Sequence, residues 1–249
     1  MTMLQFLLDI GLGLLLGTLG GLFGIGGGLL AIPVLGLLFG LDQQLAQGTA
    51  LVMVVPNVLL ALWRYHQRNR IDWRHALLLG LSSFCLAWVG AALAVGFEVE
   101  AMRRGFVVFL LALAAWNLVQ VFLRPGAGSG GLSWPWLGVL GGVAGLLGGL
   151  FGVGGAVLAT PILTLLFGAS QVVAQGLSLA LAAPSTAVTL ITYGVHGQVD
   201  WSTGIPLAVG GLLSIGWGVK LAHVLPQRLL RGLFSLFLLL CALLLGLKA

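Results

Sequence analysis

Residues 17–33 read GTLGGLFGIGGGLLAIP, a stretch apolar enough to lie in a lipid bilayer but too rich in glycine for one continuous helix. The chain carries a close copy at residues 145–161, GLLGGLFGVGGAVLATP, at an offset of 128 residues (145 minus 17). The same offset superimposes other pairs without a gap: Gln47-Gly48 on Gln175-Gly176, Pro56 on Pro184, Tyr65 on Tyr193, and Asp72-Trp73 on Asp200-Trp201. We interpret the chain as two homologous halves, residues 1–123 and 134–249, joined by a Gly- and Pro-containing linker at 124–133.

Composition decides the class of protein. Hydrophobic residues make up 59% of the chain and charged residues 7%, and the mean hydropathy is +1.14. A soluble domain would carry about 25% charged residues. Long apolar runs separated by short polar loops indicate helices, because a membrane-spanning helix needs about 20 apolar residues and satisfies its own backbone hydrogen bonds. We therefore expect an all-α polytopic membrane protein, with about four to five membrane segments in each half and Gly-rich broken helices.

The apolar runs predict ten segments: 4–23, 29–41, 43–63, 75–96 and 104–123 in the first half, and 134–152, 156–168, 171–195, 204–224 and 229–247 in the second. The second segment of each half is short. About 13 residues at 1.5 Å each reach only roughly 20 Å, against a hydrocarbon core of about 30 Å. These two segments are therefore predicted to be half-helices.

Two glycine clusters mark where the helices should break, since each glycine weakens a helix by roughly 1 kcal/mol. They are Gly24, Gly26, Gly27 and Gly28 in the first half, and Gly152, Gly154 and Gly155 in the second. A break at membrane depth must be buried in protein or line a wet cavity. Pro33 and Pro161 are expected in the first turn of the helix that follows, whose N-terminus would attract an anion. Paired interruptions in two halves of a chain point to a transporter's binding site.

A second glycine pattern has a structural explanation. Glycines recur every four residues at Gly13, Gly17 and Gly21, and at Gly141, Gly145 and Gly149, with a further row at Gly20, Gly24 and Gly28. Small residues at this spacing lie on one helix face and let two helices approach closely. We expect the rows at 13–21 and 141–149 to be helix contacts.

The third segment of each half supplies polar side chains to an apolar environment. They are Gln47, Thr49 and Asn57 in the first half, and Gln175, Ser178, Ser185 and Thr186 in the second. Such groups can line a binding site, or they can bond to their own helix and join neighbouring helices. Both readings stay open for them. Gln47 and Gln175 are the strongest candidates for substrate contact, because they occupy matched places in the two halves.

Other functional classes have weaker signals. Ser178, with His196 or His223, could form an intramembrane serine hydrolase, and a membrane assembly factor without a transported substrate is a further alternative. No catalytic residue, metal ligand, cofactor or nucleic-acid partner is expected. No nucleotide-binding module is recognisable, so active transport would depend on a coupling ion or a proton gradient.

The doubled pattern G-x-x-G-G-x-F-G-x-G-G, followed by Pro33 and Pro161 and then by the Q-G and D-W pairs, resembles the TauE/SafE family of sulfite and organosulfonate exporters. The resemblance implies a multi-pass transporter of the bacterial inner membrane that moves small sulfur-containing anions, such as sulfite, sulfoacetate, thiosulfate or taurine. Two positions depart from symmetry between the halves: Ala156 stands where Gly28 does, and Ser185 where Asn57 does.

Charge predicts the orientation, because basic loops face the cytoplasm. One basic loop holds Arg64, Arg68, Arg70 and Arg74, and another holds Lys220, Arg228 and Arg231. The counterpart of the first loop, residues 196–203, has no Lys or Arg. This contrast favours inverted halves, each crossing an odd number of times with the short segment counted, and both termini outside. An eight-helix arrangement, common in the family, would instead make the halves parallel.

Overall fold

A computed structural model describes residues 3–68, 71–122, 133 and 135–246. These residues form α1 (Met3–Phe23), α2 (Gly28–Leu38), α3 (Gln43–Arg68), α4 (Trp73–Gly96), α5 (Val99–Phe122), α6 (Trp136–Phe151), α7 (Ala156–Leu166), α8 (Gln171–Val195), α9 (Trp201–Val224) and α10 (Gln227–Gly246). No strand occurs in this part of the chain. The all-α prediction is confirmed. Apart from Ser133, the predicted linker lies outside the described residues.

Several helices match the membrane in length and composition. Five of them, α1, α3, α4, α8 and α9, are long and apolar enough to cross a bilayer. Helices α2 and α7 have 11 residues each, which is about 16 Å, or half of a hydrocarbon core. The protein is therefore a multi-pass membrane protein, and the two half-helices are present as predicted.

The order and bounds of the helices recur along the chain. Helices α2 and α7 differ by 128 residues at both ends (156 minus 28 and 166 minus 38), and so do α4 and α9. Helices α1 and α6 end at Phe23 and Phe151, again 128 residues apart. The division into halves at 1–123 and 134–249 stays an interpretation of the sequence.

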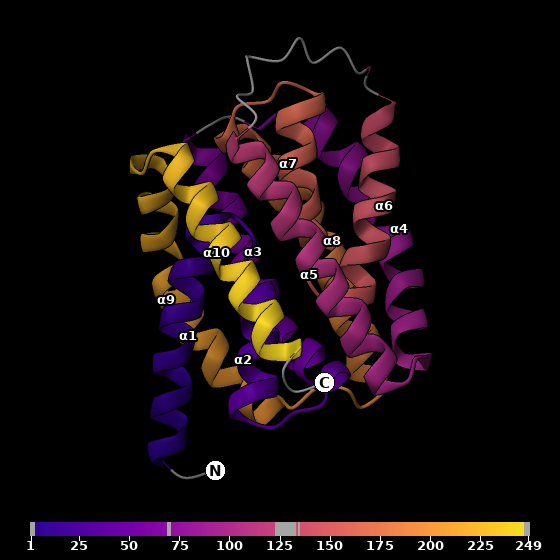
Figure 1. Cartoon of the computed structure of the whole chain (residues 1–249), viewed down its shortest axis with the longest axis vertical. Helices are drawn as coiled ribbons and strands as arrows, with labels where there is room; N and C mark the ends of the chain where they lie inside the picture. The colour runs from indigo at the N-terminus through magenta and orange to yellow at the C-terminus, as the bar shows by residue number, and fades with distance from the viewer. Residues whose placement is uncertain (1–2, 69–70, 123–132, 134, 247–249) are drawn as a thin grey trace.

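Each half-helix folds back on the helix before it. A Cβ atom added to Gly20 would lie 2.4 Å from the backbone nitrogen of Gly27, and one added to Gly148 would lie 2.3 Å from that of Gly155. Leu38, at the end of α2, lines a pocket together with residues from the first half of α1. Helices α1 and α2, like α6 and α7, therefore form hairpins that enter and leave the bundle at the same end (Figure 1).

This folding back corrects three details of the sequence-based prediction. The half-helices turn back inside the bundle, so three helices of each half (α3 to α5 and α8 to α10) run between its two ends in addition to the hairpin, which is still an odd number (Figure 1). Gly28 is the first residue of α2 rather than part of the break, and the row at Gly20, Gly24 and Gly28 does not lie on one helix. Pro33 and Pro161 lie inside α2 and α7, beyond the first turn, because the helices begin directly after the glycines.

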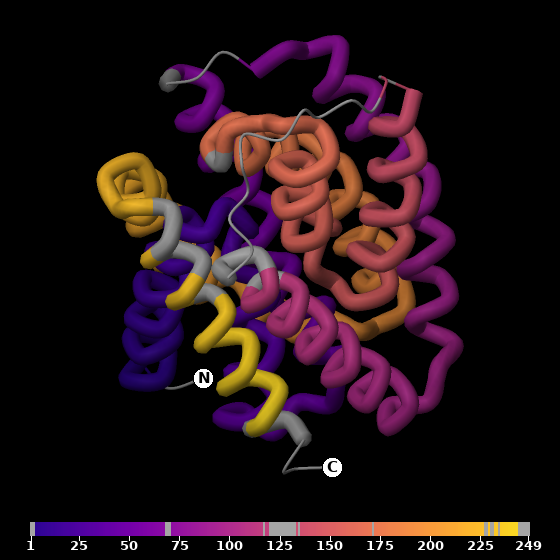
Figure 2. The backbone as a smooth tube through the Cα atoms, turned by 45° about the horizontal axis from the view of Figure 1, so that its top comes forward, coloured from indigo at the N-terminus to yellow at the C-terminus, as the bar shows by residue number. Residues whose placement is uncertain are grey.

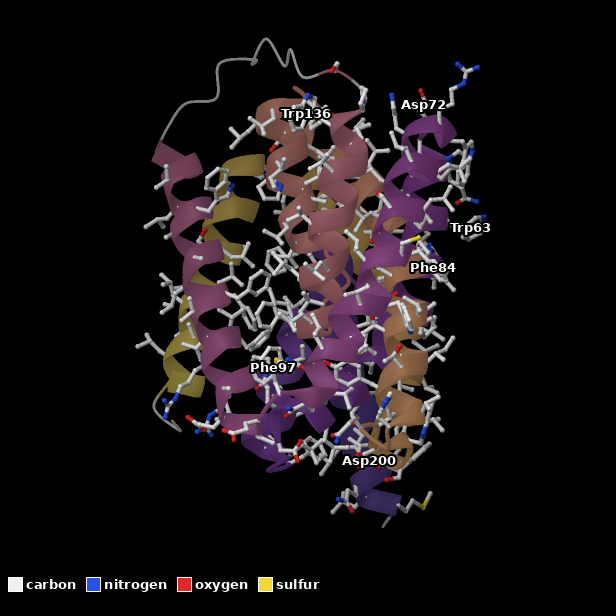
Figure 3. All side chains as sticks on the ribbon, turned by 90° about the vertical axis from the view of Figure 1, so that its right-hand side faces the viewer. Trp63, Asp72, Phe84, Phe97, Trp136 and Asp200 are labelled. Carbon is white, nitrogen blue, oxygen red and sulfur yellow. The ribbon has the colours of Figure 1, made fainter. Side chains whose placement is uncertain are left out.

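The two halves run in opposite directions. Helix α1 begins at the end of the molecule where the N-terminus is marked, whereas α6 begins at the opposite end (Figure 1). Asp72 and Asp200, which the offset of 128 residues pairs, lie at opposite ends of the bundle (Figure 3). We call these the Asp72 end and the Asp200 end. These positions agree with the inverted arrangement, which stays a prediction because it depends on the division into halves.

Contacts between helices interleave the halves. Helix α1 packs on α9, and α6 packs on α4. The predicted close-contact glycines explain both interfaces: the glycines of α1 (Gly13, Gly17 and Gly21) face the backbone of α9, and those of α6 (Gly141, Gly145 and Gly149) face α4. A Cβ atom at any of them would come within 2.5 Å of an atom of the partner helix. Helices α5 and α10 pack side by side in a layer over one side of the bundle (Figure 2).

Some helix ends differ from the prediction for local reasons. The D-W pairs begin α4 and α9: the side chain of Asp72 accepts a hydrogen bond from Arg74 N, and that of Asp200 accepts from Ser202 N. Such caps stabilise a helix by about 1 kcal/mol and place its start earlier than the apolar run does. Helix α3 runs on to Arg68, so Arg64 lies within a helix rather than in a loop.

Candidate functional site

The two hairpins end in glycine-rich turns, which we call tip 1 (residues 24–27) and tip 2 (residues 152–155). Their glycines have positive φ angles, 68°, 71° and 94° in tip 1 and 68°, 70° and 73° in tip 2. A side chain is strained in this left-handed region, whereas glycine is not. Gly27 and Gly155 form the N-caps of α2 and α7 in this conformation. The glycine clusters thus make reversals of the chain, not flexible spacers.

Both tips lie in the middle of the bundle. Tip 1 contacts Val54 and Val58 of α3, and tip 2 contacts Ala182 and Thr186 of α8. The hairpins also meet each other, since a Cβ atom added to Gly28 would lie 3.5 Å from the carbonyl oxygen of Gly152. Every residue of both tips is buried. The centre where the tips meet is therefore buried in this conformation.

The half-helices bring unpaired backbone donors to this centre. The Gly27 carbonyl accepts hydrogen bonds from Leu30 N at 3.1 Å and Ala31 N at 3.0 Å. The N–H groups of Gly28 and Leu29, in contrast, make no hydrogen bond to any described residue. Helix α7 begins in the same way, with the Gly155 carbonyl accepting from Leu158 N and Ala159 N. Free N–H groups at the positive end of a helix dipole favour a bound anion.

Gln47 lies against tip 2, although it belongs to the other half of the chain. Its Cβ atom is 3.0 Å from a Cβ atom added to Gly152. The Tyr193 hydroxyl donates towards Gln47 Oε1 at 2.8 Å and also lies 3.1 Å from the carbonyl oxygen of Leu150. Gln47 is fully buried, and its Nε2 has no hydrogen-bond partner in the described part of the chain.

Gln175 occupies the corresponding place against tip 1, with its Cγ atom 2.9 Å from a Cβ atom added to Gly24. The Tyr65 hydroxyl lies 3.0 Å from Gln175 Oε1 and 3.5 Å from the carbonyl oxygen of Gly21. Gln175 Nε2 donates to the carbonyl oxygen of Phe23 at 3.3 Å. Each tip is therefore held by a glutamine and a tyrosine from α3 and α8, which run antiparallel.

Asn57 and Ser185 also reach the tips. Asn57 Nδ2 donates to the carbonyl oxygen of Gly26 at 3.3 Å, and Ser185 Oγ lies 3.0 Å from that of Gly154. The change from Asn to Ser between the halves therefore preserves the contact with the tip. Asn57 Oδ1 has no partner among the described residues. The polar side chains at the tips are all uncharged.

Thr49 and Ser178 lie elsewhere. Thr49 Oγ1 accepts a hydrogen bond from Asp200 N at 2.9 Å, so it links α3 to the N-cap residue of α9 at the Asp200 end. Ser178 Oγ pairs with Thr160 Oγ1 at 2.9 Å and joins α8 to α7. This pairing gives Ser178 no histidine base in the described structure, and it does not favour the serine hydrolase hypothesis.

The Asp200 carboxyl group, which caps the N-terminus of α9, has a shifted pKa. Partial burial acts to raise the pKa of Asp200, but hydrogen bonds from Ser202 and Thr203 outweigh it and lower the pKa below its ordinary value. The Asp200 carboxylate is therefore ionised at neutral pH and fixes the loop whose backbone contacts Thr49.

Sequence reasoning missed Tyr65 and Tyr193 as site residues. Both are almost completely buried, with relative exposures of 1% and 0%. A buried tyrosine needs a partner for its hydroxyl, and the two tyrosines are paired by the same offset as the glutamines. That combination was the available signal. What it could not give was the crossed pairing, Tyr65 with Gln175 and Tyr193 with Gln47.

The sequence matches a known protein family over nearly its whole length. The family model described as sulfite exporter TauE/SafE matches residues 10–245. A probable membrane transporter protein of Methanocaldococcus jannaschii is 31% identical over 61% of this chain and 59% of its own length. The probable membrane transporter protein YunE of Bacillus subtilis is 25% identical over 91% of this chain and 90% of its own. A probable membrane transporter protein of Xylella fastidiosa is 28% identical over 95% and 93%. No solved structure matches the chain significantly.

Proposed function

Because the chain belongs to the TauE/SafE family of membrane transporters, we propose that it is a secondary transporter of small sulfur-containing anions. Sulfite, sulfonates and thiosulfate are the proposed substrates, carried across the bacterial inner membrane. The anion binds between tip 1 and tip 2, near the middle of the membrane. One observation carries the proposal: two helix N-termini, whose first N–H groups have no partner among the described residues, come together at a buried centre whose polar side chains are neutral.

The strength of such a site can be estimated. One helix N-terminus stabilises an anion by about 0.3 to 1 kcal/mol, and by up to about 2 kcal/mol when partly buried. Two ends are not enough to hold a desolvated anion tightly. A hydrogen bond to a charged group adds about 1.5 to 3 kcal/mol. Neutral donors such as Gln47, Gln175 and Asn57 are therefore needed alongside the helix ends.

A site made of dipoles also suits a transporter. A Lys or Arg at mid-membrane costs about 2.5 to 3.5 kcal/mol on insertion scales. A fixed charge would also feel the membrane potential whenever the empty protein changed conformation, at about 2.3 kcal/mol per 100 mV for a full crossing. Neutral donors avoid both costs, so the membrane potential does not oppose the conformational change by which the empty protein re-exposes its site to the other side.

The inverted halves suggest how the site is exposed in turn. Both tips are buried here, and the two hairpins enter from opposite ends. Movement of one hairpin opens the site to its own end, and movement of the other opens it to the opposite end. A coupling ion or proton supplies the driving force.

Basic side chains favour one orientation. Arg74 and Lys220 lie toward the Asp72 end, at the start of α4 and near the end of α9. At the Asp200 end, Arg103 and Arg104 are both paired with Glu100. We therefore place the Asp72 end in the cytoplasm, with α1 beginning and α10 ending on the outer side.

Counterflow in proteoliposomes tests the proposal. Purified protein is reconstituted, loaded with unlabelled anion and exposed to labelled sulfite, a sulfonate or thiosulfate. We expect at least one of them to accumulate above the level in protein-free liposomes. The control variant is Gly155→Leu, where even a Cβ atom would lie 2.3 Å from the carbonyl oxygen of Ala144. Absence of counterflow for all three anions, with monodisperse protein in the membrane, would refute the proposed substrate class.

A further inference from the structure

The two glutamines at the tips share a register but differ in their hydrogen bonds. Gln175 uses both ends of its carboxamide: Oε1 faces the Tyr65 hydroxyl and Nε2 donates to the Phe23 carbonyl. Gln47 uses one end, because its Oε1 faces the Tyr193 hydroxyl while Nε2 has no partner among the described residues. A fully buried N–H₂ group without an acceptor is unfavourable and calls for an explanation. A missing ligand supplies one.

The orientation of the Gln175 carboxamide is fixed by its two partners. If Gln175 were flipped, its Oε1 would face the Phe23 carbonyl oxygen, and two acceptors would meet. Its Oε1 must therefore accept from Tyr65. We assign Gln47 the same orientation, because it occupies the matching place against Tyr193, with Oε1 at 2.8 Å from the hydroxyl. The same orientation turns Gln47 Nε2 away from Tyr193, and the side chain lies along Gly152 of tip 2.

Tyr193 also lies between Gln47 and a competing acceptor, the Leu150 carbonyl oxygen, and so helps to keep the Gln47 carboxamide in this orientation. Its hydroxyl lies 3.1 Å from the Leu150 carbonyl oxygen as well as 2.8 Å from Gln47 Oε1. Without the hydroxyl, the Leu150 carbonyl would lose its neighbouring donor and could draw the Gln47 N–H₂ group toward itself. The donor would then be lost to any ligand at tip 2.

From these contacts we propose that the anion binds chiefly at tip 2, where Gln47 Nε2 and the first N–H groups of α7 are its donors, and that Tyr193 is the positioning residue for Gln47. Tip 1 is the weaker half of the site, because the Phe23 carbonyl already accepts from one of the two N–H donors of Gln175 Nε2. The inference rests on the proposed function and adds to it an unequal use of the two tips.

The matched pair Tyr193→Phe and Tyr65→Phe tests the inequality. Each substitution removes one hydroxyl from an almost fully buried ring, at equivalent places in the two halves. Affinity for sulfite and for thiosulfate is measured by calorimetry on the purified full-length protein. We expect Tyr193→Phe to weaken binding about tenfold or more, and Tyr65→Phe to change it by less than about threefold.

A double-mutant cycle separates positioning from a general effect on structure. If Tyr193 acts through Gln47, the double variant Tyr193→Phe/Gln47→Leu binds no more weakly than Gln47→Leu alone. A merely structural role would make the two losses add. Gln47→Met, which keeps an unbranched side chain of similar length, replaces Gln47→Leu should that variant not fold.

The outcomes are distinct. Equal effects of Tyr193→Phe and Tyr65→Phe, or additive losses in the cycle, overturn the inference while leaving the proposed function in place. Failure of the unsubstituted protein to bind either anion, in a preparation that unfolds cooperatively, overturns the proposed substrate class and this inference with it. A strong loss confined to Tyr193→Phe and non-additive with Gln47 supports both.

Discussion

Replacing Gly20 with alanine probes the geometry on which the site depends. Gly20 lies in α1, where the chain of tip 1 turns back against it. A Cβ atom at this position would lie 2.4 Å from Gly27 N and 2.7 Å from Gly27 Cα. Ordinary contacts of this kind begin near 3.4 Å, so the two backbones would have to separate by about 1 Å. Backbone cannot rotate out of the way as a side chain can.

The expected cost falls on transport more than on folding. Overpacking costs about 1 to 3 kcal/mol, and alanine in a helix recovers about 1 kcal/mol relative to glycine. The net loss, roughly 0 to 2 kcal/mol, leaves a folded protein. A displacement of about 1 Å in a binding site can cost about 100-fold in activity. We therefore expect Gly20→Ala to lower the rate of anion transport at least tenfold.

Gly11→Ala is the matched control, because it adds the same methyl group to the same helix with no atom within 4 Å. The assay is the initial rate of labelled anion uptake into proteoliposomes, normalised to the amount of monodisperse protein. Gly11→Ala should transport at the unsubstituted rate. If Gly20→Ala transports within twofold of Gly11→Ala, close contact between α1 and tip 1 is not required, and the proposed anion site between the two tips is refuted.

Three other expectations follow from the structure. With Cys85 and Cys241 replaced, Arg74→Cys and Ser202→Cys, which are exposed second residues of α4 and α9, should react with an impermeant thiol reagent from opposite sides of intact cells; equal labelling would disprove the inverted arrangement. Thr49→Val leaves Asp200 N without its acceptor, which should cost about 1 kcal/mol and lower the melting temperature by roughly 2 to 4 °C, as measured by thermal unfolding in detergent. Because the folded pKa of Asp200 is lowered, its carboxylate stabilises the fold above the unfolded value of about 3.9 and loses this effect as pH falls through the folded value. The stability difference between the unsubstituted protein and Asp200→Asn should therefore shrink in acid, and a difference that persists at the lowest pH would contradict this account.

Much of the fold can be predicted from the sequence, because it depends on composition and on the properties of residues that are close together in the chain. Hydrophobic content alone requires membrane helices, since backbone groups cannot remain unpaired in lipid. Glycine clusters predict interruptions of those helices, and the structure places them at residues 24–27 and 152–155. The rows at Gly13–Gly21 and Gly141–Gly149 predict close helix contacts, which the structure shows as the interfaces with α9 and α4.

Only the tertiary structure decides the direction of the chain after each break and the partners of the polar side chains. A run of glycines permits a reversal but does not require one, and the fold-back of α2 depends on the close contact between Gly20 and Gly27. The crossed pairs Tyr65 with Gln175 and Tyr193 with Gln47 depend on α3 and α8 lying antiparallel. Residues 110 and 146 positions apart are brought together by packing between whole helices, which no local pattern encodes.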